Sequence, residues 1–206
     1  MADPFADKAK DWDAGDFRSQ LSSHIGGAMV ARVPFAADMR VMDLGAGTGL
    51  VTGQIAPRVG KVTAVDTSAA MLAQLTAKPE LKGKVEAVEQ DIVHHPLGRT
   101  FDAVISAMAM HHIEDTAGLA KSLAGHTHPG AWLALADLDS EDGTFHEAGT
   151  EGVFHHGFDR EALGAHLEGA GFTDVTFSTV FEVERRGRPF SIFLVTARRG
   201  AEPASP

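Results

Sequence analysis

The sequence contains no cysteine and no tyrosine. Without cysteine the chain can form no disulfide, no thiolate metal site and no cysteine nucleophile. Without tyrosine, a further candidate for a general base is absent. Histidine then remains as the side chain whose ordinary pKa lies near neutral, and the chain has 11 histidines. Any acid–base chemistry near neutral pH is therefore expected to involve histidine.

Positive charge and long apolar runs are also scarce. Lysine and arginine number 18 against 28 aspartates and glutamates, and the formal net charge is −10. Nucleic acids and anionic membranes attract basic surfaces, so this balance argues against both as partners. No apolar run approaches the roughly 18 residues that would span a bilayer. The opening "MADPFADKAKDWDAGDF" lacks the basic and apolar regions of a signal peptide. We expect a soluble cytoplasmic protein.

The chain of 206 residues is most simply one domain around one sizeable core. Phe17, Leu21 and Ile25 recur at steps of four, which predicts an amphipathic helix near the amino terminus. The expected organisation has three parts: an amino-terminal helical segment that acts as a lid (1–38), a main domain (39–198) and a flexible tail (199–206).

The main domain alternates between expected strands and helices and ends in a hairpin. Strands are predicted at 40–44, 61–66, 84–91, 101–106 and 130–138, and helices at 48–59, 68–78, 115–126 and 159–171. Residues 175–183 and 190–197 flank the turn "RRGRP", and because no helix separates them, one strand must run antiparallel. The predicted fold class is α/β: a Rossmann-like doubly wound sheet of about seven strands with an antiparallel last strand, in a three-layer αβα sandwich.

A glycine-rich loop follows the first expected strand in "VMDLGAGTGL", residues 41–50. Gly45, Gly47 and Gly49 suit a tight turn that a ligand can approach closely. The dinucleotide-binding fingerprint needs glycine or alanine where this chain has Leu50, and the Lys-Ser/Thr pair of a phosphate-binding loop is missing. The loop therefore fits a ligand without a pyrophosphate.

Three acids near successive strand ends narrow the choice of ligand. The carboxylate of Asp43, just before the loop, is suited to bind a ligand that carries an amino group. Asp66 at the end of the second strand can accept both hydrogens of a ribose diol. Asp91 could accept from an adenine amino group, with Ile92 packing on the ring. Any one acid could be a helix cap or a solvated strand end, but the set with the loop indicates S-adenosylmethionine.

The motifs "VMDLGAGTG", "VTAVDTS", "VEQDI", "FDAVISAMAMHHIED" and "HPGAWLALADLD" follow in order over roughly residues 39–198. In these motifs the sequence resembles the class I S-adenosylmethionine-dependent methyltransferases, in particular the small-molecule group with the ubiquinone- and menaquinone-type enzymes (methyltransferase type 11/12-like). The resemblance implies an enzyme that moves a methyl group from S-adenosylmethionine to an O, N or S atom of a small molecule, with the main domain binding the cofactor.

The resemblance also implies site residues. It places Asp66 at the ribose, Asp91 beside the adenine and the glycine loop under the methionine portion. The expected cofactor-binding residues are Asp43, Gly45, Ala46, Gly47, Thr48, Gly49, Asp66, Thr67, Met71, Asp91, Ile92, Ser106 and Met108.

The segments after the fourth and fifth strands are expected to line the acceptor pocket. They carry the candidate general bases His111, His112, His155 and His156. Trp12 in the lid segment, Met110 and Asp137 are expected in the substrate pocket. His111, His146, His155, Asp137 and Asp139 share this sheet edge, but no segment has the H-E-x-x-H type of spacing, so no metal is expected.

Two other functions stay open. A methyltransferase acting on protein or RNA is disfavoured by the acidic charge and by the absence of an N-P-P-[YF] tetrapeptide. A regulatory protein that binds the cofactor without transferring a methyl group is compatible with the sequence.

Overall fold

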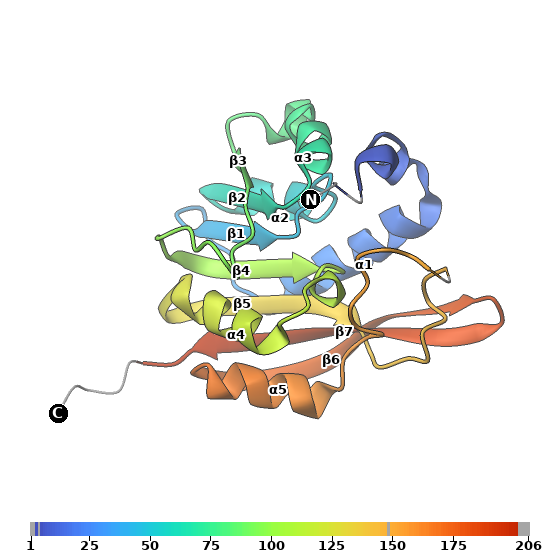
Figure 1. Ribbon diagram of the computed structural model, residues 1–206. Helices are drawn as coiled ribbons and strands as arrows, with labels where there is room; N and C mark the ends of the chain where they lie inside the picture. Colours follow the sequence, from blue (N-terminus) through green and yellow to red (C-terminus); the bar gives the residue numbers. More distant parts are fainter. Residues whose placement is uncertain (1–2, 4, 148, 202–206) are drawn as a thin grey trace.

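The computed structural model describes residues 3, 5–147 and 149–201, which fold around one seven-stranded sheet of order β3-β2-β1-β4-β5-β7-β6 (Figure 1). Strands β1 to β5 pair in parallel, whereas β7 runs antiparallel to both β5 and β6. The predicted doubly wound sheet with an antiparallel last strand is confirmed. The strands are β1 (Arg40–Leu44), β2 (Lys61–Asp66), β3 (Val85–Glu89), β4 (Phe101–Ala107), β5 (Thr127–Leu138), β6 (Phe172–Arg185) and β7 (Arg188–Arg199).

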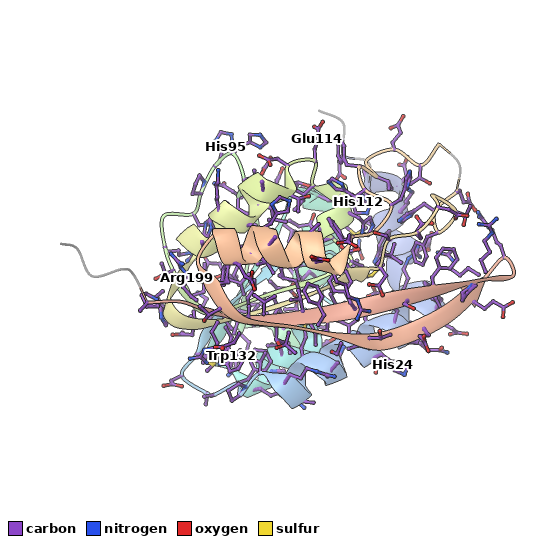
Figure 2. All side chains as sticks on the ribbon, turned by 90° about the horizontal axis from the view of Figure 1, so that it is seen from below. His24, His95, His112, Glu114, Trp132 and Arg199 are labelled. Carbon is purple, nitrogen blue, oxygen red and sulfur yellow. The ribbon has the colours of Figure 1, made fainter. Side chains whose placement is uncertain are left out.

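Helices cover both faces of the sheet. Side chains alternate between the faces along each strand, so Val41 packs with α1, α2 and α3 while Met42 packs with α4 and α5. Figure 2 shows α1 on one side of the β6–β7 hairpin and α4 and α5 on the other. The helices are α1 (Asp16–Arg32), α2 (Thr52–Ile55), α3 (Ala69–Thr76), α4 (Thr116–Gly125) and α5 (Arg160–Gly169), with 3₁₀ helices η1 (Ala6–Ala14), η2 (Ala56–Arg58), η3 (Pro79–Leu81) and η4 (Met110–His112).

Side-chain caps fix where the helices begin. The Ser68 hydroxyl accepts a hydrogen bond from Met71 N at 3.1 Å, and Asp159 caps α5 in the same way. The helix expected over 48–59 is shorter than predicted. It begins at Thr52, because Gly49 has φ +85°, and from Ala56 it continues as a 3₁₀ turn that contains Pro57.

Helix α1 runs without a break through Gly26 and Gly27. The Gln54 side chain lies against Gly26, where a Cβ atom would come within 2.5 Å of its amide. Gln54 Nε2 donates to Ser22 O at 2.9 Å. Gly26 therefore lets α1 pack closely on α2, which offsets its low helix propensity.

Strand β7 extends to Arg199, and Gly200 N donates to Gly171 O at 2.9 Å. The first two residues of the expected tail are thus held by the sheet, and residues 202–206 lie outside the described residues. No helix in the described part of the chain is long and apolar enough to cross a membrane.

Candidate active site

A cavity of about 940 Å³ opens at the carboxyl ends of the parallel strands. These ends point to the right in Figure 1, where the amino-terminal segment and the loop between β5 and α5 also lie. In Figure 2, His112, which lines the cavity, lies toward this end, and Trp132 and Arg199 lie toward the other. The walls come from η1, α1, the glycine loop, the ends of β2 to β4, and residues 145–147 and 150–154. This is the edge at which doubly wound sheets bind ligands.

The glycine loop forms the floor of one half of the cavity. Gly45 and Gly47 have φ of +66° and +54°, and a Cβ atom on Gly45 would collide with Ala109. Asp66 holds the loop from below: its Oδ2 accepts from Gly47 N at 2.7 Å and its Oδ1 from Ser68 N at 2.9 Å. Each oxygen keeps a second lone pair for a ligand hydroxyl. Burial raises the pKa of Asp66 above its ordinary value.

Asp43 lies under the same loop and is 2% exposed. Its Oδ2 accepts a hydrogen bond from the Thr52 hydroxyl at 2.5 Å. Burial raises its pKa to about 7, and the neighbouring charge of Asp66 acts in the same direction. A nearby cation favours the ionised form of a carboxyl group and lowers its pKa. Asp43 is therefore suited to bind a cationic group of a ligand as a carboxylate.

Asp91 closes the far end of this half. Its Oδ1 accepts from Val93 N at 2.9 Å, and its Oδ2 lies 2.7 Å from His94 Nδ1. Burial raises the pKa of Asp91, but the bonds to His94 and Val93 outweigh that effect and the pKa is lowered. Ile92 beside it is buried and lines the cavity.

The other half of the cavity, called the acceptor half below, is lined by His111, His112 and His146, and His111 pairs with Asp137 behind the wall. His111 Nδ1 lies 2.7 Å from Asp137 Oδ1, and His111 N donates to Asp137 Oδ2 at 3.2 Å. Both side chains are buried. With Asp137 as a carboxylate, Nδ1 carries the ring proton and Nε2 is an acceptor. His111 Nε2 is buried and has no hydrogen-bond partner among the residues that the structure describes.

Two further histidines pack around His111. The ring centroid of His111 lies 4.1 Å from that of His112 and 5.0 Å from that of His146. Burial, and after it the charge of His111, lowers the pKa of both neighbours to about 4. His146 Nε2 is also buried without a partner in the described part of the chain. At neutral pH these two rings are uncharged.

His155 and His156 were expected to line the pocket, but the structure places them outside it. His155 N donates to His111 O at 3.2 Å, and its ring turns away, with Nε2 2.9 Å from Ile113 O. The His156 side chain is 61% exposed, with Nδ1 3.7 Å from Glu141. His146, in the same loop, lines the cavity instead. The sequence placed His146 in a segment expected to line the pocket, but His146 was not among the candidate bases.

Four other expected site residues lie behind the cavity wall. The Ser106 hydroxyl is fully buried and donates to Leu44 O at 2.8 Å, which links β4 to β1. Met110 packs in the core beneath α4, and Gly49 lies against α3. Asp137 is fully buried beneath His111. These residues shape the site without lining it. The remaining expected residues (Gly45, Ala46, Gly47, Thr48, Asp66, Thr67, Met71, Met108 and Trp12, with Asp43, Asp91 and Ile92) line the cavity.

The amino-terminal segment crosses the cavity and is bonded to the glycine loop. Asp13 Oδ1 accepts from the Thr48 hydroxyl at 2.5 Å, and Asp13 Oδ2 pairs with Lys78 Nζ at 2.7 Å. The Phe5 ring lies 5.9 Å from Trp12 and 5.2 Å from His112, centroid to centroid. Both halves of the cavity therefore contact this segment.

The histidine cluster does not form a metal-binding arrangement. Within residues 3, 5–147 and 149–201, no group of three or more His, Asp or Glu side chains is placed to hold a metal ion.

Comparison with known proteins agrees with this geometry. A family model described as a methyltransferase domain matches residues 41–130, which include the glycine loop, Asp66, Asp91 and His111. An uncharacterised methyltransferase of Mycobacterium tuberculosis is 35% identical over 113 residues, 54% of this chain and 56% of the relative. The trans-aconitate 2-methyltransferase of Deinococcus radiodurans is 32% identical over 123 residues, 58% of this chain and 44% of that protein.

The match thus spans about half the length of these relatives. Among solved structures, the complex of DhpI with S-adenosylhomocysteine (SAH) superposes with a TM-score of 0.72 at 21% identity, covering 96% of this chain and 94% of that one. Residues 41–130 thus match a methyltransferase domain, and the sheet order and the superposition show that the chain shares the fold of the S-adenosylhomocysteine-bound structure.

Proposed function

We propose that this protein transfers a methyl group from S-adenosylmethionine to a small-molecule acceptor, with His111 as the general base. The observation that carries the proposal is the shared cavity: the acids and the glycine loop line the same space as His111, whose Nε2 has no hydrogen-bond partner among the described residues. A cofactor site alone would not need a buried, oriented imidazole beside it.

The residues of the cofactor half fit S-adenosylmethionine. Asp43 matches the amino group of its methionine portion, and the spare lone pairs of Asp66 match a ribose diol. Asp91 and Ile92 match an adenine amino group and ring face. When bound, the cofactor supplies a methyl group whose bond to sulfur breaks with its electron pair left on sulfur, giving SAH.

The residues of the acceptor half act on the nucleophile. His111 Nε2 accepts the proton of an O–H, N–H or S–H group as that atom's lone pair forms the new bond to carbon. Asp137 keeps the His111 ring oriented and stabilises the imidazolium that results. The uncharged rings of His112 and His146 add no positive charge beside a cationic cofactor. Trp12 and Phe5 exclude water, which is the role proposed for the 1–38 segment.

A small acceptor suits the size and enclosure of the site. The cavity of about 940 Å³ must hold both ligands under the amino-terminal segment. The relative from Deinococcus radiodurans acts, by its name, on trans-aconitate, which is a small molecule. Both points support a small acceptor over a protein or RNA.

The test combines binding with turnover. Thermal shift with SAH should show stabilisation of about 2.7 kcal/mol at a hundredfold excess over the dissociation constant, with a nicotinamide dinucleotide as the negative control. SAH formation is then followed with S-adenosylmethionine and a panel of phenols, amines, thiols and hydroxy acids. A response to the dinucleotide alone would reject the cofactor assignment. Tight SAH binding without turnover on any acceptor, including protein and RNA, would identify a regulatory protein.

A further inference from the structure

Arg185 ends strand β6 and lines the outer part of the acceptor half. Its guanidinium carbon lies 4.6 Å from the ring centroid of Phe145 and 5.2 Å from that of Phe17. In the part of the chain that the structure describes, no carboxylate oxygen lies within 4.0 Å of its guanidinium. Arg185 is thus a half-buried cation that lies against two aromatic rings and lines the cavity, with no counter-ion among the described residues.

The neighbouring arginines of the same hairpin are paired. Arg186 Nη2 lies 3.2 Å from Glu147, and Arg188 pairs with Asp142. Burial lowers the pKa of Arg185, and the charges of Arg186 and Arg18 lower it further, while Glu147 opposes them. Arg18 itself stacks over Trp12 at 4.1 Å on the same cavity. A desolvated cation among other cations is costly unless an anion joins it.

Arg185 and His111 lie on one continuous wall. The ring of His146 lies 5.0 Å from that of His111 and 5.0 Å from that of Phe145, and Phe145 in turn contacts Arg185. His111 and Arg185 therefore line the same cavity, so one small molecule lying along this wall can contact both residues.

We propose that the methyl acceptor carries an oxyanion, a carboxylate or a phosphate-type group, which binds Arg185 while a separate nucleophilic atom lies at His111 Nε2. The guanidinium presents parallel N–H donors that match such oxyanions in a bidentate geometry. The aromatic rings of Phe17 and Phe145 fix its orientation. The proposal rests on the proposed function, since it names the chemistry of that acceptor.

The first experiment needs no turnover, so it is independent of whether transfer occurs. The full chain saturated with SAH is titrated by calorimetry with benzoate, phenylphosphonate and the neutral analogue benzamide. At least one anion should bind about tenfold or more tightly than benzamide, and Arg185→Met should abolish that difference. Arg188→Met, on the same hairpin but outside the cavity, should keep it, and Arg185→Lys should keep part of it. Tighter binding of benzoate would indicate a carboxylate on the acceptor, and tighter binding of phenylphosphonate would indicate a phosphate-type group.

The second experiment uses the acceptor found in the screen and its amide or ester, in which the oxyanion is neutralised. Arg185→Met should raise KM for the anionic acceptor about tenfold or more and leave KM for the neutral analogue unchanged. SAH affinity should stay at the parental value. The proposal is overturned if the three calorimetric probes bind the parent equally or not at all, or if Arg185→Met weakens SAH itself, which would assign Arg185 to the cofactor.

Discussion

The two halves of the cavity are assembled in different ways. The cofactor half is built at the ends of β1, β2 and β3, which are neighbours both in the chain and in the sheet. The acceptor half draws on η1 and α1, on η4, on residues 145–147 and 150–154 and on the end of β6, which are far apart in sequence. A parallel sheet alone brings the first set together, whereas the second set depends on how loops pack.

The halves also differ in charge. Asp43, Asp66 and Asp91 face the first half, which suits a cationic ligand. The neutral imidazoles of His112 and His146 line the second half together with Glu147, Glu151 and Arg185, and among the described residues Arg185 has no carboxylate within 4.0 Å. Arg185 therefore suits an anionic group on the acceptor. Substitutions in the cofactor half should therefore alter affinity for the cofactor. Substitutions in the acceptor half should instead alter turnover.

The largest effect is expected at His111. His111→Gln should lower kcat by roughly a hundredfold or more, because the proton acceptor is lost, while SAH affinity by calorimetry stays at the parental value. His156→Gln is the matched control, since this exposed ring lies outside the cavity, and it should turn over normally. Parental turnover in His111→Gln would mean that the site aligns the acceptor without a base.

In the cofactor half, Asp66→Ala should weaken SAH binding by about 1.5–3 kcal/mol, because the variant loses a charged acceptor and the anchor of Gly47 N. Asp91→Ala should cost less, since Ile92 still packs on the adenine. Glu168→Ala, in an exposed position near the end of α5, should leave affinity unchanged. If calorimetry gave the same SAH affinity for Asp66→Ala and Glu168→Ala, the proposal that Asp66 binds the ribose would be contradicted.

A smaller effect concerns pH and the buried Asp43. Its pKa rises from 3.8 to about 7 in the folded chain, so between these values the unfolded state has released a proton that the native state retains. The stability of the ligand-free protein should therefore fall as pH rises from about 4 to 7 and level off above 7. Asp43→Asn should flatten this decline, with a residual slope of the same sign from Asp66. Urea unfolding at pH 5 and pH 8 gives the free energy of unfolding at each pH. If this free energy changed equally with pH in the parent and in Asp43→Asn, Asp43 would not be the group that causes the decline.

The same contrast explains how much could be read from the sequence. The order of strands and helices, the cap at Ser68 and the position of Asp66 at the end of β2 follow from local patterns. His155 and His156 were misplaced because their position depends on backbone bonds, such as His155 N to His111 O, that no local pattern reveals. Arg185 was missed because its side chain reaches the cavity through the length of the β6–β7 hairpin.

The link from Thr48 through Asp13 to Lys78 has a consequence for the timing of the catalytic cycle. These bonds tie the amino-terminal segment to the glycine loop, so under the proposed function we expect SAH to leave only after they break. Departure of SAH then becomes a gated step that competes with chemistry to limit the steady-state rate. Because one bond is an ion pair near the surface, added salt should shorten the residence time of SAH. Trp12 lines the cavity, so its fluorescence should change when the amino-terminal segment opens.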